Sequence, residues 1–304
     1  MSVVDRGRVE MKYLLKNLFI IGIITGSFVF GLSTGHYKHF PFDLVYKIKN
    51  GRDVAINTDF RWGGRNFNVD LYTSKETDPL KNIGVYLTYG QSNSSNSGEY
   101  GYFVKNNVFQ YLLGQTFVYE DPSLGGTGIG GSVWGMVGDK LIENGFYDQV
   151  VFSNSGWGGK TIGELKNGHE FEFLVTNYNG LIKKYGRVHG ILFHQGENNN
   201  SLEGVRNYYN DFSDFISNLK ERGIEIPIYL SRVSLCGNNL PINETLTDIQ
   251  NQIIRDFSLV KEGPNTDLLS SETDRLDDYC HFSLQGYDKF SDMWVELLTR
   301  TDER

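Results

Sequence analysis

Apolar runs alternate with amphipathic segments from about residue 82 to the end of the chain. Five runs predict strands because they are apolar on both faces and end at turn-forming residues: 83–89, 149–153, 188–193, 226–233 and 267–270. Five segments with helical spacing lie between or after them: 133–143, 162–185, 205–219, 244–257 and 285–298. Gly223 is expected to end the third helix. This α/β alternation predicts a mostly parallel five-stranded sheet with helices on both faces.

The first 35 residues follow a different pattern. Basic residues precede residues 18–32, an uncharged and strongly apolar run. This combination predicts either a cleaved signal peptide or an uncleaved membrane anchor with its basic end in the cytoplasm, and a buried core helix is the third alternative. Residues 36–81 are interpreted as a stem and a segment that packs on the main domain, which spans 82–304. An extracytoplasmic location is therefore expected, whether membrane-anchored, periplasmic or secreted.

Composition and charge narrow the class of protein. Hydrophobic residues make up 39% of the 304 residues, enough for a large core. The net charge of −8 argues against a nucleic-acid partner, since phosphates require a basic surface. No zinc-type spacing joins the histidines with Cys236 and Cys280. In an oxidising compartment these cysteines can form a disulfide, and two buried free thiols are the alternative.

The residues that follow the predicted strands carry the chemistry. Ligands of parallel sheets bind beyond the carboxyl ends of the strands, where Ser92 follows the first one. A serine hydroxyl needs a base to become a nucleophile. Asp278 precedes His281 by three residues, which suits a carboxylate that holds the imidazole while the other ring nitrogen accepts a proton. A surface histidine with a chance acidic neighbour is the alternative interpretation.

An oxyanion that forms on the substrate needs preorganised hydrogen-bond donors. The backbone N–H of Ser92 is one candidate, and Gly159 allows the close approach of a second N–H. A third donor is the side-chain amide of Gln195 or of Asn198. For these two amides, a structural role in the loop is the alternative.

Four short blocks in this order carry a resemblance: GQSN at 90–93, GGKT at 158–161, HQGEN at 194–198, and the Asp278–His281 pair. They resemble the blocks of the SGNH-hydrolase superfamily and, more narrowly, the sialate O-acetylesterase-like carbohydrate esterases. The resemblance covers about residues 82–300. It implies a flavodoxin-like three-layer α/β/α sandwich and hydrolysis of O-acetyl esters on carbohydrates without a metal or cofactor. It also implies that Ser92 is the nucleophile, His281 the base and Asp278 its partner.

Several residues beside these blocks are candidates for substrate binding: Gln91, Asn93, Trp157, Glu197 and Arg232. Trp157 suits stacking on a sugar ring, with core packing as the alternative. For Glu197, the favoured interpretation is that it positions the turn through backbone N–H groups. Arg232 suits an acidic sugar, with an ion pair at a strand end as the favoured alternative. The glycine-rich stretch 120–135 is neither a P-loop nor a dinucleotide motif, and we expect a loop that lines a pocket.

The sequence thus predicts a serine esterase that removes acetyl groups from a glycan, with sialic acid as one possible sugar. The alternatives are an O-acetyltransferase with the same triad, which moves acetyl to a polysaccharide, and a non-catalytic glycan-binding protein. A lipase or thioesterase is disfavoured because the loops are rich in Gly, Asn and Ser, whereas an acyl-chain site is mainly apolar.

Overall fold

The computed structural model describes residues 61–62, 65–237 and 241–301, all of which lie in the second of two compact units, Ile56–Arg304. The predicted signal peptide or anchor at 1–35, and the stem up to residue 60, lie outside the described residues. Within the described part, no helix has both the length and the apolar character that crossing a bilayer requires.

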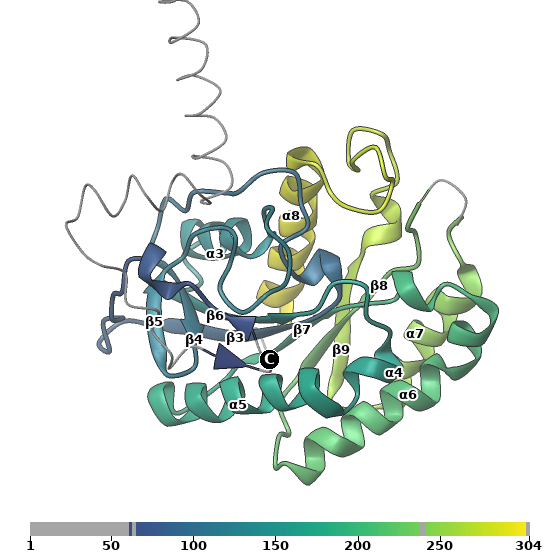
Figure 1. Ribbon diagram of the computed structural model, residues 1–304, viewed down its shortest axis with the longest axis horizontal. Helices are drawn as coiled ribbons and strands as arrows, with labels where there is room; N and C mark the ends of the chain where they lie inside the picture. Colours follow the sequence, from purple (N-terminus) through teal and green to yellow (C-terminus); the bar gives the residue numbers. More distant parts are fainter. Residues whose placement is uncertain (1–60, 63–64, 238–240, 302–304) are drawn as a thin grey trace, which may run out of the picture. The chain divides into compact units, whose positions relative to one another are not determined.

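A seven-stranded, mostly parallel sheet forms the centre of the described region, with the strand order β5-β4-β6-β3-β7-β8-β9 (Figure 1). The parallel strands are β3 (Ile83–Gly90), β4 (Val108–Leu112), β6 (Gln149–Gly156), β7 (Gly190–His194), β8 (Ile228–Arg232) and β9 (Val260–Asn265). β5 (Gln115–Val118) pairs antiparallel with β4 at one edge. The α/β class is confirmed, and the predicted number of five strands is too low.

Four of the five predicted strands are present as β3, β6, β7 and β8. Every residue of β3 and β6 is buried, which explains why these strands are apolar on both faces. The β4–β5 hairpin was not predicted. Its two-residue turn has positive φ at Leu113 (44°) and Gly114 (103°), so a leucine occupies a place where Asn or Asp is the usual sequence signal.

The strand predicted at 267–270 is wrong. Residues 266–268 form a short 3₁₀ helix, η4 (Thr266–Leu268), and the edge strand β9 precedes it. The apolar pattern of β9 is interrupted by the exposed pair Lys261 and Glu262 and then by Pro264. Charges and proline are tolerated at a sheet edge, so this strand lacks the continuous apolar run by which the central strands are recognised.

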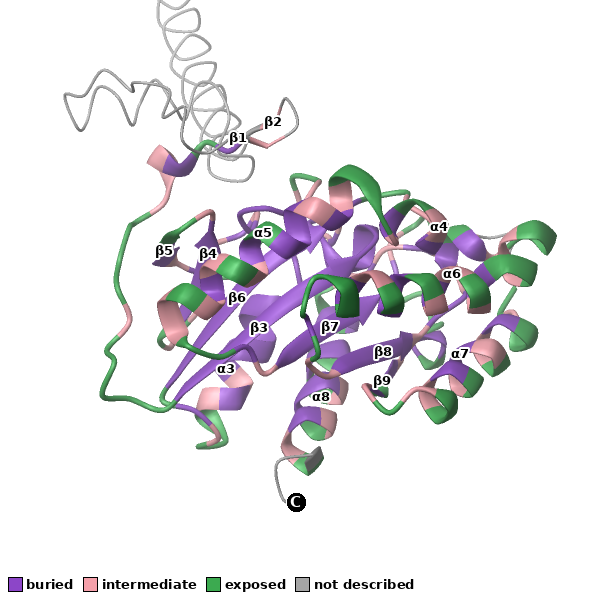
Figure 2. Ribbon diagram, turned by 90° about the horizontal axis from the view of Figure 1, so that it is seen from below, coloured by how far each residue is buried: buried purple, intermediate pink, exposed green. Residues whose placement is uncertain are grey.

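Helices cover both faces of the sheet (Figure 2). On one face lie α3 (Trp134–Glu143) and α8 (Leu284–Thr301), and on the other lie α4 (Ile162–Leu165), α5 (Gly168–Tyr185), α6 (Leu202–Glu221) and α7 (Glu244–Asp256). Each layer has its own buried apolar cluster against the sheet. The helix predicted over 162–185 is divided into α4 and α5, because a left-handed residue, Gly168 (φ 76°), starts the second helix in a new direction. Gly223 (φ 71°) follows the end of α6 as predicted.

A connecting segment, residues 61–72, precedes the sheet. It contains a two-stranded ribbon, β1 (Arg61–Trp62) and β2 (Arg65–Asn66), and a 3₁₀ turn, η1 (Val69–Leu71). Trp62 and Phe67 pack on Phe173 of α5, with ring centroids 5.4 and 5.7 Å apart. The segment is therefore anchored to the α5 face by aromatic contacts.

Candidate active site

The carboxyl ends of β3, β6 and β7 meet at one point of the sheet edge. Gly90, the last residue of β3, pairs in register with Gly156 of β6 and with His194 of β7. The loops that follow these strands therefore start side by side. They contain three of the four sequence blocks.

The turn after β3 presents Ser92. Gly90 has φ 137°, and a Cβ there would lie 2.0 Å from the carbonyl oxygen of His194, so only glycine fits. The chain then enters a 3₁₀ turn, η2 (Ser92–Ser94). Ser92 is 7% exposed, and its N–H has no hydrogen-bond acceptor among the described residues. A nearly buried hydroxyl beside an unused N–H suits a nucleophile with an oxyanion donor.

The loop before α8 holds the Asp–His pair. Oδ1 of Asp278 accepts the N–H groups of Cys280 and His281, both at 2.9 Å, and Oδ2 lies 2.5 Å from Nδ1 of His281. Tyr279 between them is left-handed (φ 53°), which turns the chain back towards the carboxylate. Burial alone would raise the pKa of Asp278, but the hydrogen bonds from His281 and Cys280 outweigh it and lower that pKa. The carboxylate thus stays ionised beside the imidazole.

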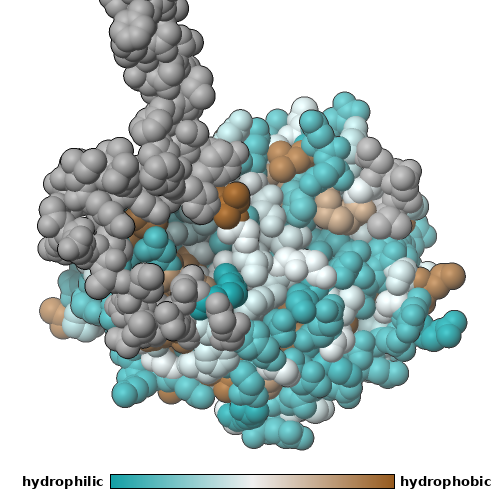
Figure 3. Space-filling model, in the orientation of Figure 1, coloured by the Kyte–Doolittle hydropathy of each residue, from teal (hydrophilic) through white to brown (hydrophobic). Residues whose placement is uncertain are grey.

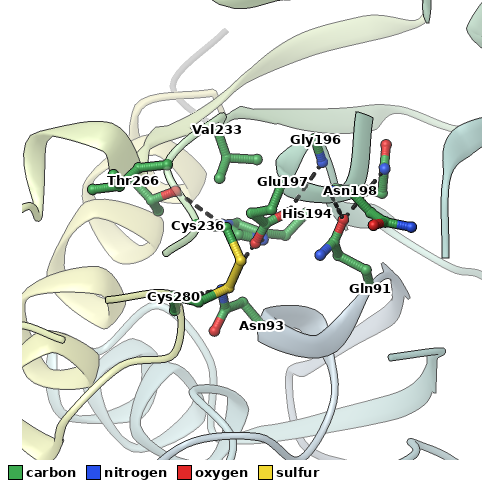
Figure 4. A network of polar contacts seen from close by, with 12 residues as sticks. Gln91, Asn93, His194, Gly196, Glu197, Asn198, Val233, Cys236, Thr266 and Cys280 are labelled. Carbon is green, nitrogen blue, oxygen red and sulfur yellow. Dashed lines mark hydrogen bonds and ion pairs between the residues drawn. A yellow bond between two sulfur atoms is a disulfide. The ribbon is translucent and has the colours of Figure 1, made fainter. Parts of the chain in front are cut away.

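Asn93 links the serine turn to the histidine loop. Its Nδ2 donates to the carbonyl oxygen of Cys280 at 3.0 Å and to Oε1 of Glu197 at 2.9 Å (Figure 4). Asn93 follows Ser92 directly, and Cys280 precedes His281. This contact brings the two sequence neighbourhoods together although 187 positions separate Asn93 and Cys280. No hydrogen bond joins the Ser92 hydroxyl to His281 in the described structure.

A disulfide between Cys236 and Cys280 ties the loop after β8 to the same point (Figure 4). The bridge, which the sequence left open, is formed. The carbonyl of Cys280 also accepts Nη1 of the buried Arg275 at 2.6 Å. Residue 280 is therefore held by a covalent bond, an arginine and Asn93, so the backbone next to His281 is rigidly placed.

Beneath these loops lies a buried polar layer. The side chain of Glu197 has no exposed surface; its Oε2 accepts the N–H of Gly196 at 3.1 Å, and its Oε1 lies 3.5 Å from Nδ1 of His194. Burial raises the pKa of Glu197, and the hydrogen bond from Asn93 opposes that rise. Burial, together with the charge of Arg275, lowers the pKa of His194 to about 3, so this imidazole is neutral. Nε2 of His194 lies 2.9 Å from the hydroxyl of Thr266.

The turn after β6 contains Gly158 and Gly159. A Cβ at Gly158 would lie 3.9 Å from Cβ of Ser92, so this turn borders the serine. The N–H of Gly158 donates to Oγ1 of Thr127 at 2.6 Å. The N–H of Gly159 has no acceptor in the described part of the chain. Gly159 is left-handed (φ 72°), and its carbonyl accepts Nδ2 of Asn198 at 2.7 Å.

The two amides proposed for the oxyanion site differ in their surroundings. Gln195 is fully buried, and its Nε2 lies 2.6 Å from Oδ1 of Asn199 and 3.2 Å from the carbonyl of Lys160. Both of its N–H groups are therefore used inside the protein. Asn198 is exposed and uses one N–H group on Gly159, which leaves the other for a ligand.

The residues expected to bind substrate lie mostly below the surface. Gln91 is 3% exposed, and its Oε1 accepts the N–H of Asn198 at 3.0 Å. Asn93 and Glu197 are buried against each other. Trp157 is 7% exposed and packs on Phe173 and against the guanidinium of Arg65. This is the core packing that the sequence analysis gave as the alternative to sugar stacking.

Arg232 lies at the edge between β8 and β9. Its Nη2 is 2.6 Å from Oε1 of Glu262 and donates to the carbonyl of Gly263 at 3.0 Å. The ion pair at a strand end, which the sequence analysis favoured, is the arrangement in the structure. In the structure, Oε1 of Gln91, Nδ2 of Asn93 and the guanidinium of Arg232 make contacts within the protein, and the roles of these three residues in substrate binding stay predictions.

Sequence reasoning missed three residues around the site: Thr127, Arg65 and Arg275. Thr127 belongs to the glycine-rich stretch, whose composition indicated a loop near a pocket but no particular contact. Arg65 and Arg275 reach the site through tertiary contacts only. Within the described residues, no cluster of His, Cys, Asp and Glu is suited to hold a metal ion.

The parallel sheet with its polar loops at the carboxyl ends of the strands, together with a match to a family model, defines the chain as a carbohydrate esterase. Residues 139–300, more than half of the chain, match the family "Carbohydrate esterase, sialic acid-specific acetylesterase". The chain belongs to this family and is a carbohydrate acetylesterase. The match begins after Ser92, so the nucleophile turn rests on the structure and sequence alone.

Solved structures share the fold. A protein from Arabidopsis thaliana is similar with a TM-score of 0.56 and 14% identity, over 72% of this chain and 98% of that chain. The protein NanS is similar with a TM-score of 0.50 and 14% identity, over 74% of this chain and 99% of that chain. A comparison with curated proteins gives no match. At such identities, the structural likeness establishes the fold only.

Proposed function

We propose that this acetylesterase hydrolyses O-acetyl groups on a carbohydrate through a triad of Ser92, His281 and Asp278. One observation carries the assignment. Asn93 beside the serine binds the carbonyl of Cys280 beside the histidine, at 3.0 Å, while Asp278 holds Nδ1 of the same imidazole. The imidazole is thus oriented with Nε2 as its free nitrogen, within the neighbourhood of the serine hydroxyl.

The cycle has two steps. Nε2 of His281 accepts the proton of Ser92 as Oγ attacks the acetyl carbonyl carbon, and the imidazolium then gives the proton to the departing sugar oxygen. The products of this step are an acetyl-serine and the free sugar alcohol. Water, deprotonated by the same nitrogen, attacks the acetyl-serine and releases acetate, and the proton returns to Ser92. Asp278 stabilises the imidazolium in both steps.

The donors for the oxyanion are the N–H groups of Ser92 and Gly159 and the Asn198 amide. Each has a hydrogen that no acceptor in the described residues uses, whereas the Gln195 amide is fully engaged. We therefore assign the third donor to Asn198 and a supporting role to Gln195. A single donor of this kind contributes about 3 kcal/mol to transition-state stabilisation.

The substrate class is an acetylated glycan, with sialic acid or another sugar as the carrier. On the face shown in Figure 3, the coloured residues are mainly hydrophilic or intermediate, and the hydrophobic ones are scattered. The loops that hold Ser92, Gly159 and Asn198 are rich in Gly, Asn and Ser, which supports a sugar substrate over a long acyl chain. We further propose an extracytoplasmic location, because a Cys236–Cys280 bridge persists where thiols are oxidised and the basic-apolar N-terminus suits export or anchoring to the membrane.

The test measures acetate release by the full chain from a phenyl acetate and from a panel of acetylated sugars. Ser92→Ala and His281→Ala should each lower kcat by at least about 1,000-fold. Ser217→Ala, on the exposed face of α6, is the matched control and should retain full activity. Wild-type activity in Ser92→Ala would refute the triad. An acetylated acceptor in place of free acetate would favour the O-acetyltransferase, and binding without turnover would favour the glycan-binding alternative.

A further inference from the structure

The glycine-rich loop, residues 124–131, lies against the oxyanion side of the site. We propose that Thr127 of this loop is a positioning residue that holds the Gly158–Gly159 turn in register with Ser92. The inference rests on the proposed function, since it takes Ser92 as the nucleophile and the N–H of Gly159 as an oxyanion donor.

Thr127 is tied to the site through three of its atoms. Its hydroxyl oxygen accepts the N–H of Gly158 at 2.6 Å, and its own N–H donates to the carbonyl of Gly156 at 3.1 Å. Its carbonyl accepts the N–H of Asn96 at 2.9 Å and also contacts the Ser95 hydroxyl. One residue thus joins the end of β6, the glycine turn and the chain that follows the serine turn.

The Thr127 hydroxyl determines which N–H group of the glycine turn is free to face Ser92. Two consecutive glycines have no side chains to fix their orientation, so the turn depends on hydrogen bonds. Oγ1 of Thr127 engages the N–H of Gly158, and the N–H of Gly159 is left unpaired within the described structure. The carbonyl of Gly159 is fixed from the other side by Asn198. Loss of the hydroxyl would let the turn rotate and misplace the donor.

The loop that carries Thr127 is itself fixed. Nη1 and Nη2 of Arg65 donate to the carbonyls of Gly125 and Gly126 at 3.4 and 3.0 Å, and the guanidinium lies 4.7 Å from the ring centroid of Trp157. A Cβ at Gly125 would lie 2.1 Å from the carbonyl oxygen of Asn154, so the loop approaches β6 closely. Thr127 is therefore presented on a braced loop, as a positioning role requires.

The experiment compares Thr127→Val, which keeps the shape and removes the acceptor, with Thr127→Ser, which keeps the hydroxyl. Thr176→Val on the exposed face of α5 is the control. Thr127→Val should lower kcat on the acetyl ester by about 10- to 100-fold with KM within about twofold, since small misplacements near the reacting atoms have effects of this size. Thr127→Ser should recover kcat to within about threefold of the wild type.

A second pair of variants separates the effect of the hydroxyl on kcat from an effect on folding. Thr127→Ala and Thr127→Ser both lack the methyl group, so a difference in kcat between them reports the hydroxyl alone, and melting curves identify variants that fail to fold. Equal kcat in the Ala and Ser variants, or unchanged or raised kcat in Thr127→Val, would overturn the inference. Ser92→Ala is measured beside them: if it stays active, the proposed triad fails, whereas an inactive Ser92→Ala with a fully active Thr127→Val refutes only the role of Thr127.

Discussion

Removal of the Cys236–Cys280 bridge is expected to weaken the fold far more than the chemistry. The two cysteines are 44 positions apart. The loop-closure entropy of a chain of that length corresponds to about 4 kcal/mol at 25 °C, on the view that a disulfide acts mainly by restricting the unfolded state. Replacement of both cysteines by alanine should therefore lower the unfolding free energy by about 4 kcal/mol. The melting temperature should fall by roughly 10 °C, given the size of the domain.

Catalysis should survive this loss because other bonds hold residue 280. Its carbonyl accepts Arg275 at 2.6 Å and Asn93 at 3.0 Å, and its N–H donates to Asp278 at 2.9 Å. We expect kcat of the folded double variant at 25 °C to stay within about tenfold of the wild type, which is 1.4 kcal/mol in activation free energy.

The assay combines urea unfolding and steady-state acetate release on both proteins. Dithiothreitol should reproduce the loss of stability in the wild type and leave the stability of the double variant unchanged. The double variant is therefore the control for effects of dithiothreitol other than reduction of the bridge. An unchanged unfolding midpoint would refute the entropic reasoning. A loss of kcat of more than about 100-fold in a folded variant would show that Arg275 and Asn93 do not hold the loop of His281 in place without the bridge.

Three other predictions follow from buried contacts. Asn93→Ala should lower the unfolding free energy by about 2 kcal/mol, measured in urea, because Glu197 loses its amide donor while buried; no change would contradict that hydrogen bond. Gly90→Ala should fail to fold or lose more than about 3 kcal/mol of unfolding free energy, because the added methyl group overlaps the carbonyl of His194. Gly145→Ala, which is also at positive φ but has free space around it, should lose only about 1 kcal/mol. Equal losses in the two variants would refute the steric argument. His194, with its pKa lowered to about 3, cannot take up the proton that the unfolded chain binds below about pH 6.5, so stability should fall as pH drops. Between about pH 8 and about pH 5, the wild type should lose about 2 kcal/mol more of its unfolding free energy than His194→Gln. Equal shifts of the urea midpoint in both proteins over that range would argue against a neutral buried imidazole.

The central strands were predictable because burial on both faces leaves a continuous apolar run in the sequence. β3 and β6 have no exposed residue and were found with nearly correct bounds. The edge strands were not predictable in this way. β9 contains exposed charges and a proline, and the turn of the β4–β5 hairpin carries Leu113 at a positive φ, which the residue type does not indicate.

The candidate site was partly predictable for a related reason. Ser92 follows a buried strand, and Asp278 and His281 form a local pair, so sequence position alone placed them as candidates. Glu197 accepts the N–H of Gly196, as its favoured interpretation states. The other contacts of Asn93, Glu197 and Gln195 were not predictable, because burial of a polar side chain depends on which loops meet above it. Their amide and carboxylate groups connect loops about 100 or more positions apart, or fill the space beneath them.

The connecting segment 61–72 sets where the catalytic unit begins. Trp62 and Phe67 shield Phe173, and Arg65 binds two carbonyls of the glycine-rich loop. An expression boundary drawn at the first strand of the sheet would uncover an aromatic patch and remove the brace of that loop together. A truncated enzyme that starts at residue 82 would then be expected to aggregate and to have a lower kcat, although Ser92, Asp278 and His281 are all present.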